Sequence, residues 1–143
     1  MGLLSIKATQ YKVAILEKNF SIARTLAEAG LEEARVKINK DLNFPPEVAE
    51  QSIYSYTEEV VNSDGERIGV YQVSVDMSKD KSPDYYIIIT STGIVGTTDP
   101  SDNPLAIRSI SARIDTASKE RSNPLNDNGY YFRVIDYQDG GSL

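Results

Sequence analysis

The chain has 143 residues, of which 40% are hydrophobic and 25% charged, an ordinary composition for one folded domain. Its net charge of −6 repels phosphate backbones and anionic lipid headgroups, so no nucleic-acid partner is expected. It contains no cysteine, histidine or tryptophan, which excludes thiol nucleophiles, disulfides, tetrahedral zinc sites and histidine-based triads. We therefore expect no enzyme, with no catalytic residues, no cofactor, no small-molecule substrate and, apart from the calcium binding considered below, no metal site.

A single long helix is predicted over residues 5–42. This range has no proline and one glycine, its apolar residues recur at helical spacing, and Pro45-Pro46 follow it. Such a helix would be ~57 Å long, whereas a compact domain of this length has a radius of gyration of ~14–15 Å. One end must project, and we expect it to be the N-terminal half. The second half, from about Phe20, should pack on the rest of the chain.

A seam of apolar and small residues follows one side of this helix. Its spacing is 4, 3, 4, 3 over Leu16, Phe20, Ala23, Ala27 and Gly30. The small residues have two readings: the chain's own sheet approaches the helix closely there, or a neighbouring subunit's helix does. We select these five residues as a candidate subunit-packing seam. Leu3, Leu4 and Ile6 would form an exposed apolar end beyond it.

After Pro46 the apolar period changes to two, which is typical of strands. The turn residues at 62–65 predict a hairpin. The expected strands are 52–61, a returning strand with Tyr71, Val73, Val75 and Met77 on one face, 85–91 ended by Thr92-Gly93, 105–117 with Ile110, Ala112 and Ile114 on one face, and 130–137 before a frayed tail at 138–143. The predicted fold class is α+β: one domain over 1–143, with an N-terminal helix packed on an antiparallel meander sheet at 50–137.

Two loops carry several Asp and Asn side chains. Residues 97–104 and 126–129 provide oxygen ligands of the type that calcium needs. Their spacing matches no EF-hand, and Asx-rich loops are commonly turns, so calcium binding stays open.

Four segments carry a family resemblance. They are LAEAGLEEA (26–34), GVYQVSV (69–75), YYIIITSTG (85–93) and RSISARI (108–114). In this order they resemble the minor pilins of type IV pili, especially the PilX-like group, over about residues 20–117. The resemblance implies a pilin-like fold. It also implies a cleaved leader and an apolar N-terminal helix that anchors the subunit in the membrane before assembly; on this reading the chain is a soluble fragment lacking both.

The expected function is therefore structural. The chain would be a minor pilin or pseudopilin that assembles with other pilin or pilin-like subunits into a type IV pilus-like filament or secretion pseudopilus. It would be located at the cell surface, with membrane contact only through the N-terminal helix. The alternative is an adhesin-type binding module that recognises a glycan or a protein through the loops at 97–104 and 119–129.

Overall fold

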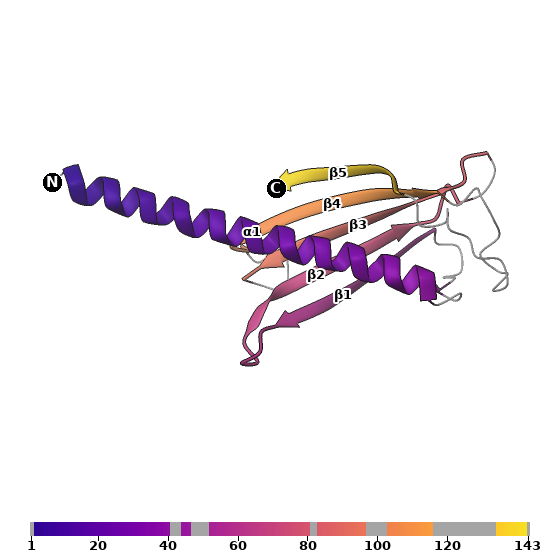
Figure 1. Ribbon diagram of the computed structural model, residues 1–143, viewed down its shortest axis with the longest axis horizontal. Coiled ribbons are helices and arrows are strands. Elements are labelled where there is room, and N and C mark those ends of the chain that lie inside the picture. Colours follow the sequence, from indigo (N-terminus) through magenta and orange to yellow (C-terminus); the bar gives the residue numbers. More distant parts are fainter. Residues whose placement is uncertain are drawn as a thin grey trace.

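The computed structural model describes residues 2–40, 44–46, 52–80, 83–96, 103–115 and 134–142. For 2–9, 11, 134–135 and 141–142 it describes the course of the backbone alone. The elements are α1 (Gly2–Lys40), β1 (Ile53–Val61), β2 (Arg67–Asp76), β3 (Tyr86–Val95), β4 (Ala106–Asp115) and β5 (Val134–Ser142). A long N-terminal helix lies across one face of an antiparallel sheet (Figure 1), which confirms the predicted α+β class.

The five strands form one sheet in the order β1-β2-β3-β4-β5, each antiparallel to the next. β1 and β5 are therefore its edges. The predicted hairpin joins β1 to β2, and the Oδ1 of Asn62 accepts hydrogen bonds from the backbone N–H of Asp64 (3.0 Å) and Glu66 (2.9 Å). Gly65 completes the turn with φ +81°, a conformation that glycine adopts without strain.

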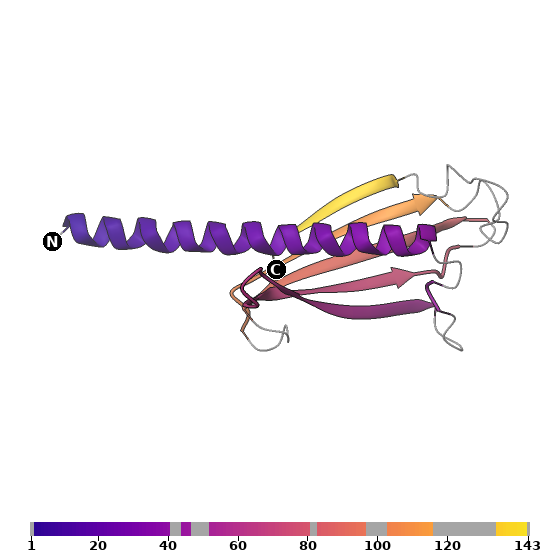
Figure 2. The same cartoon turned by 60° about the horizontal axis from the view of Figure 1, so that its bottom comes forward.

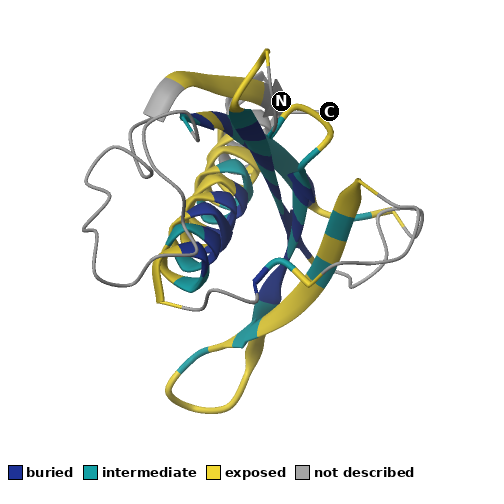
Figure 3. Cartoon of the chain, turned by 90° about the vertical axis from the view of Figure 1, so that its right-hand side faces the viewer, coloured by how far each residue is buried: buried dark blue, intermediate teal, exposed yellow. Residues whose placement is uncertain are grey.

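The core lies between the second half of α1 and one face of the sheet (Figures 2 and 3). α1 packs on β2, β3 and β4. Alternate residues of each of these strands point toward it, including the predicted faces of β2 and β4. The fully buried strand residues in this core cluster are Val73, Val75, Ile89, Ile110, Ala112 and Ile114.

β3 does not end at Thr92-Gly93, so that part of the prediction is wrong. The strand continues to Val95, and Gly93 pairs with Tyr71 on β2 and Arg108 on β4. A Cβ atom at position 93 would overlap the carbonyl oxygen of Ala23 and lie 2.8 Å from the backbone nitrogen of Ala27. The glycine therefore permits close approach of the helix backbone rather than a turn.

The predicted frayed tail is also wrong. Residues up to Ser142 belong to β5, where Gln138 pairs with Ser111 and Ser142 with Arg108. The run of aspartate, glycine and serine is unfavourable in strands, and it contains a bulge: three steps of β5, from Asp139 to Ser142, oppose two steps of β4, from Ile110 to Arg108. Residues 130–133 and 143 lie outside the described part.

Three aromatic rings link the end of α1 to the edge strand β1. Phe44 lies 5.7 Å from Tyr54 and 5.9 Å from Tyr56, ring centroid to centroid, in edge-to-face geometry. The ammonium of Lys37 lies 4.2 Å from the centroid of Tyr56 and 2.6 Å from Glu33. Burial raises the pKa of the Tyr56 phenol, and the nearby carboxylates of Glu33 and Glu58 add to the rise.

Candidate functional site

α1 consists of a bare half and a packed half. With 39 residues it is ~58 Å long at 1.5 Å per residue. The described side chains from Gln10 to Lys18 are all exposed, whereas Phe20 is half-buried and Ala23 is fully buried. Figure 1 shows the first half extending beyond the sheet, as the sequence predicts. The bare half, residues 2–18, is ~25 Å long.

Large apolar side chains are exposed on this bare half. Val13, Ile15 and Leu16 are 48%, 42% and 49% exposed. Helical spacing places Val13, Leu16 and Phe20 in line with the buried residues Ala23 and Ala27. We call Val13, Leu16 and Phe20 the exposed stripe. It continues the apolar face that the sheet covers farther along the helix.

The five residues of the predicted seam are therefore divided between core and surface. Ala23 and Ala27 are 0% exposed and face the chain's own sheet. Gly30 is buried beside Ser91 and Tyr71, where a Cβ would overlap the Ser91 Oγ. For these three residues the structure supports the intramolecular reading of the small side chains. Leu16 and, in part, Phe20 face solvent.

The predicted apolar end is helical in its backbone. The side chains of Leu3, Leu4 and Ile6 lie outside the described residues.

The bare half is positively charged, unlike the rest of the chain. Lys7, Lys12 and Lys18 against Glu17 give residues 1–20 a formal charge of +3 − 1 = +2. The whole chain carries −6, so residues 21–143 carry −6 − 2 = −8. Lys12 and Lys18 are both exposed. The bare half thus combines apolar and basic groups.

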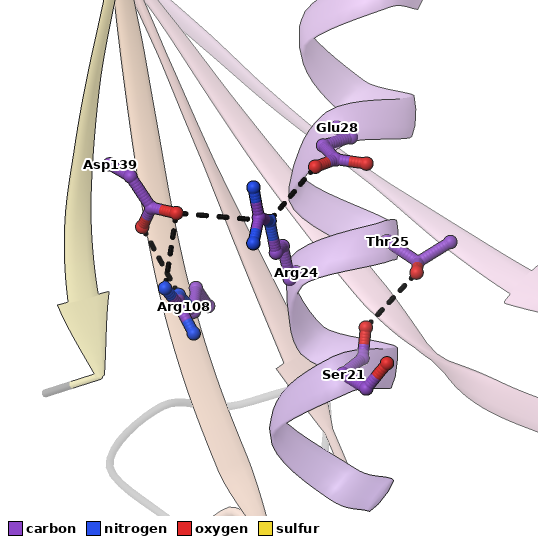
Figure 4. Close-up of polar contacts among 6 residues, drawn as sticks. All are labelled: Ser21, Arg24, Thr25, Glu28, Arg108 and Asp139. Carbon is purple, nitrogen blue, oxygen red and sulfur yellow. Dashed lines mark hydrogen bonds and ion pairs between the residues drawn. The ribbon is translucent and has the colours of Figure 1, made fainter. Parts of the chain in front are cut away.

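An arginine pair fixes the place where α1 leaves the sheet (Figure 4). Arg108 on β4 donates two hydrogen bonds to the Asp139 carboxylate on β5, at 3.1 and 3.0 Å. The Arg24 Nε on α1 lies 3.8 Å from the same carboxylate and 3.0 Å from Glu28. The hydrogen bond to Glu28 and the two carboxylates raise the pKa of the Arg24 guanidinium. The helix is thereby tied to the last strand, and no local sequence pattern predicts the pairing.

The face of the sheet opposite α1 carries an uncharged polar surface. At its centre, residues from neighbouring strands align in register and bear only hydroxyl and amide groups: Ser55, Thr57, Gln72, Ser74, Thr90, Thr92, Ser109, Ser111 and Gln138. Among them, Thr92 and Ser109 share a hydrogen bond of 2.7 Å. An open groove of about 320 Å³ lies over β1, β2 and β3. The period-two recurrence of Ser, Thr and Gln could have revealed this surface in the sequence, but the prediction missed it.

Within the described residues, no group of three or more acidic, histidine or cysteine side chains is arranged to hold a metal ion. Residues 97–102 and 116–133, which contain most of the first loop and all of the second loop proposed for ligands, lie outside that part. The helical segment described contains no stretch both long and apolar enough to span a bilayer. The chain was also compared with known proteins. No family model, curated protein or solved structure matches it.

Proposed function

We propose that the chain is a structural, non-enzymatic subunit of a pilin-type filament: a minor pilin of a type IV pilus or a pseudopilin of a secretion system. In this proposal the sheet domain is the head, and the bare half of α1 is the assembly element. Its partners are other pilin or pilin-like subunits at the cell surface. The observation that carries the proposal is the exposed stripe, which extends a buried helix face past the end of its own sheet.

Covering the stripe is energetically favourable. Val13 and Leu16 are each about half exposed, and burying their remaining surface would contribute roughly 1 kcal/mol per side chain. The bare half of α1, residues 2–18, packs on nothing in its own chain as far as the structure describes it. Such a helical segment is marginally stable in water, because most helix stability in proteins comes from tertiary contacts. A neighbouring subunit that covers the bare half would therefore bury these apolar side chains and stabilise the helix itself.

Other features agree with this proposal. The order of a long helix and a five-stranded meander fits the α+β layout of a pilin head. The four resembling segments lie on the packed half of α1 and on β2, β3 and β4, the elements that form the core.

A pair of matched variants tests the assembly element. Val13 and Val36 lie on the same helix with exposures of 48% and 47%, but Val13 is on the bare half and Val36 on the packed half. We expect Val13→Glu to weaken self-association and co-assembly with pilin-like subunits. Val36→Glu should leave both unchanged. Sedimentation velocity over a series of protein concentrations measures the association, and circular dichroism checks that both variants fold. Equal behaviour of the two variants would contradict the proposal.

The second candidate function, an adhesin-type binding module, is favoured by the groove on the open sheet face. Its lining includes Thr57, Ser74 and Thr90, and hydroxyl groups of this kind suit a neutral glycan. In this case Thr90→Lys should abolish retention on neutral polysaccharide columns such as amylose and dextran. Ser63→Lys, in the exposed hairpin turn, is the control. Retention that is unchanged in Thr90→Lys, or absent in the wild type, would remove this candidate.

A further inference from the structure

β1 is an edge strand whose outer side pairs with no other strand in the part of the chain that the structure describes. It forms the lower margin of the sheet in Figures 1 and 2, and α1 packs mainly on β2, β3 and β4. Its nine residues, IYSYTEEVV, include no proline or lysine, the residues that commonly blunt such an edge. The ladder of the other edge strand, β5, shifts register twice. β1 is therefore the edge that is better suited to accept another strand.

The backbone hydrogen bonds at the two ends of the β1–β2 ladder show which residues of β1 direct their polar groups outward. The N–H of Met77 donates to the carbonyl of Ser52 at 2.7 Å, and the N–H of Asn62 donates to the carbonyl of Glu66 at 2.8 Å. In an antiparallel pair alternate residues bond to the same neighbour, so the even-numbered residues of β1 bond to β2. The register shift inserts its extra residue in β2, so this alternation continues along β1. The odd-numbered residues direct N–H and C=O away from β2, and all of them are exposed: Ile53, Ser55, Thr57, Glu59 and Val61.

We propose that β1 of one copy pairs antiparallel with β1 of a second copy, about a two-fold axis at Thr57. The outward residues of the two copies then face each other in hydrogen-bonded pairs: Thr57 with Thr57, Ser55 with Glu59, and Ile53 with Val61. Because each pair exchanges two bonds, the contact would contain about ten backbone hydrogen bonds. The two five-stranded sheets would join into one continuous sheet, with both helices on the same face.

The apolar side chains of β1 are arranged symmetrically about Thr57. Ile53 and Val61, which are 49% and 53% exposed, lie equally far from it on the face opposite α1, so the pairing would cover each with the other. On the helix face, the half-buried Tyr54 and Val60 are also equally far from Thr57 and would meet in the same way. One contact would thus cover the exposed apolar residues at both ends of the strand.

Charge and apolar contact select this register among its neighbours. Because outward residues must face outward residues, one copy can shift only by an even number of residues. A shift of two residues in one direction places Glu58 opposite its own copy, and a shift of four does so for Glu59; like charges directly opposite each other are destabilising. A shift of two in the other direction places Ile53 opposite Glu59 and leaves Val61 without a partner in β1. In the proposed register neither glutamate lies opposite an acid.

This contact goes beyond the proposed function, because it does not involve the bare half of α1. It joins the same surface on both copies, so it closes into a dimer and does not propagate. The two-fold axis is perpendicular to the sheet, and the two bare halves would therefore extend in opposite directions. Subunits that assemble side by side through their bare halves would point the same way, so the dimer is a separate, closed state of the head.

Opposite charges at position 57 test the contact. Thr57→Lys and Thr57→Glu each place like charges across the two-fold axis, so each should dimerise about fivefold more weakly than the wild type. An equimolar mixture of the two should recover dimers, because a lysine then faces a glutamate. Ser63→Lys and Ser63→Glu, in the exposed hairpin turn, are the matched controls and should dimerise as the wild type does. Sedimentation equilibrium over a series of protein concentrations measures dimerisation, and circular dichroism checks folding.

Cysteine substitution tests the register, since the chain has no cysteine of its own. Thr57→Cys should form disulfide-linked dimers under a mild oxidant, because the Cα atoms of a hydrogen-bonded pair are about 5.5 Å apart, within the range that a disulfide spans. Ser55→Cys and Glu59→Cys should each crosslink poorly alone, since each position is ~14 Å from its own copy along the strands. A mixture of these two variants should crosslink readily. Ser63→Cys measures crosslinking by chance collision.

The outcomes separate this contact from the proposed function. Crosslinking of Ser55→Cys alone as fast as that of Thr57→Cys, or the absence of dimers in the wild type, overturns the contact. If Val13→Glu weakens association and the position 57 variants do not, the filament subunit stands and the β1 contact is wrong. If the position 57 variants weaken association and Val13→Glu does not, the contact stands and the proposed function is contradicted.

Discussion

Replacing Gly93 with alanine should destabilise the protein more than the same change at Gly30 or Gly140. The added Cβ would overlap the Ala23 carbonyl oxygen and lie 2.8 Å from the Ala27 nitrogen. Both obstructing atoms belong to the helix backbone, so no side-chain rotation relieves the contact and the whole of α1 must shift. Overpacking in a core costs about 1–3 kcal/mol, and rigid obstruction places this change at about 3 kcal/mol.

Two other glycines calibrate the result. At Gly140 on β5, a Cβ would lie 3.3 Å from the nearest atom, the Ser109 carbonyl oxygen, so alanine there should cost less than ~1 kcal/mol. At Gly30 the obstructing atoms are the side chains of Ser91 and Tyr71, which can move, and alanine regains ~1 kcal/mol of helix propensity. The Gly30→Ala variant should therefore fall between the other two.

Urea unfolding measures all three variants, and an unchanged dependence of the unfolding free energy on urea shows that only stability has changed. If Gly93→Ala is no less stable than Gly140→Ala, the close approach of α1 to β3 is refuted.

Three further predictions concern the core and the junction. The Ser91 hydroxyl is fully buried and has no hydrogen-bond partner among the described residues, so Ser91→Ala should be neutral or stabilise by up to ~1 kcal/mol in urea unfolding; a loss above that, measured against Ser111→Ala, would mean that the hydroxyl is satisfied. Because burial raises the folded-state pKa of Tyr56 above its unfolded value of ~10, its contribution to stability is complete below that pH and is lost as pH rises toward the folded-state value. Tyr56→Phe should therefore lose less stability than the wild type in unfolding measurements above pH ~10, and parallel pH profiles would contradict this. Asp139→Asn should cost about 1 kcal/mol by weakening the link between Arg108, Arg24 and β5, whereas Asp136→Asn should cost little; equal effects in thermal unfolding would show that the link is not stabilising.

The sequence predicts the main elements because their patterns are local. Helical spacing without proline locates α1 to within three residues at its start and two at its end, and alternation locates the inward faces of β2 and β4. The division of α1 into a bare and a packed half follows from its length alone, since no compact domain of this size could cover it.

What the sequence could not show depends on contacts between distant residues. Gly93 has the local character of a strand end, and only the position of Ala23 and Ala27 across the interface explains why the strand continues. The Asp-Gly-Gly-Ser segment has the character of a tail, and its pairing with β4 includes the contact between Arg108 and Asp139, 31 positions apart. For the same reason the seam could not be divided between core and surface until the end of the sheet was located.

The most direct test of the central claim, that the bare half of α1 is covered on assembly, uses the absence of cysteine from the chain. A thiol introduced by Leu16→Cys lies on the exposed stripe, and one introduced by Val36→Cys lies on the solvent side of the packed half; the native side chains are 49% and 47% exposed. The measurement is the rate of maleimide labelling of each thiol in dilute protein and under assembling conditions. The account predicts equal rates in dilute protein, and slower labelling at position 16 alone on assembly. Labelling at position 16 that stays as fast as at position 36 under both conditions would contradict it.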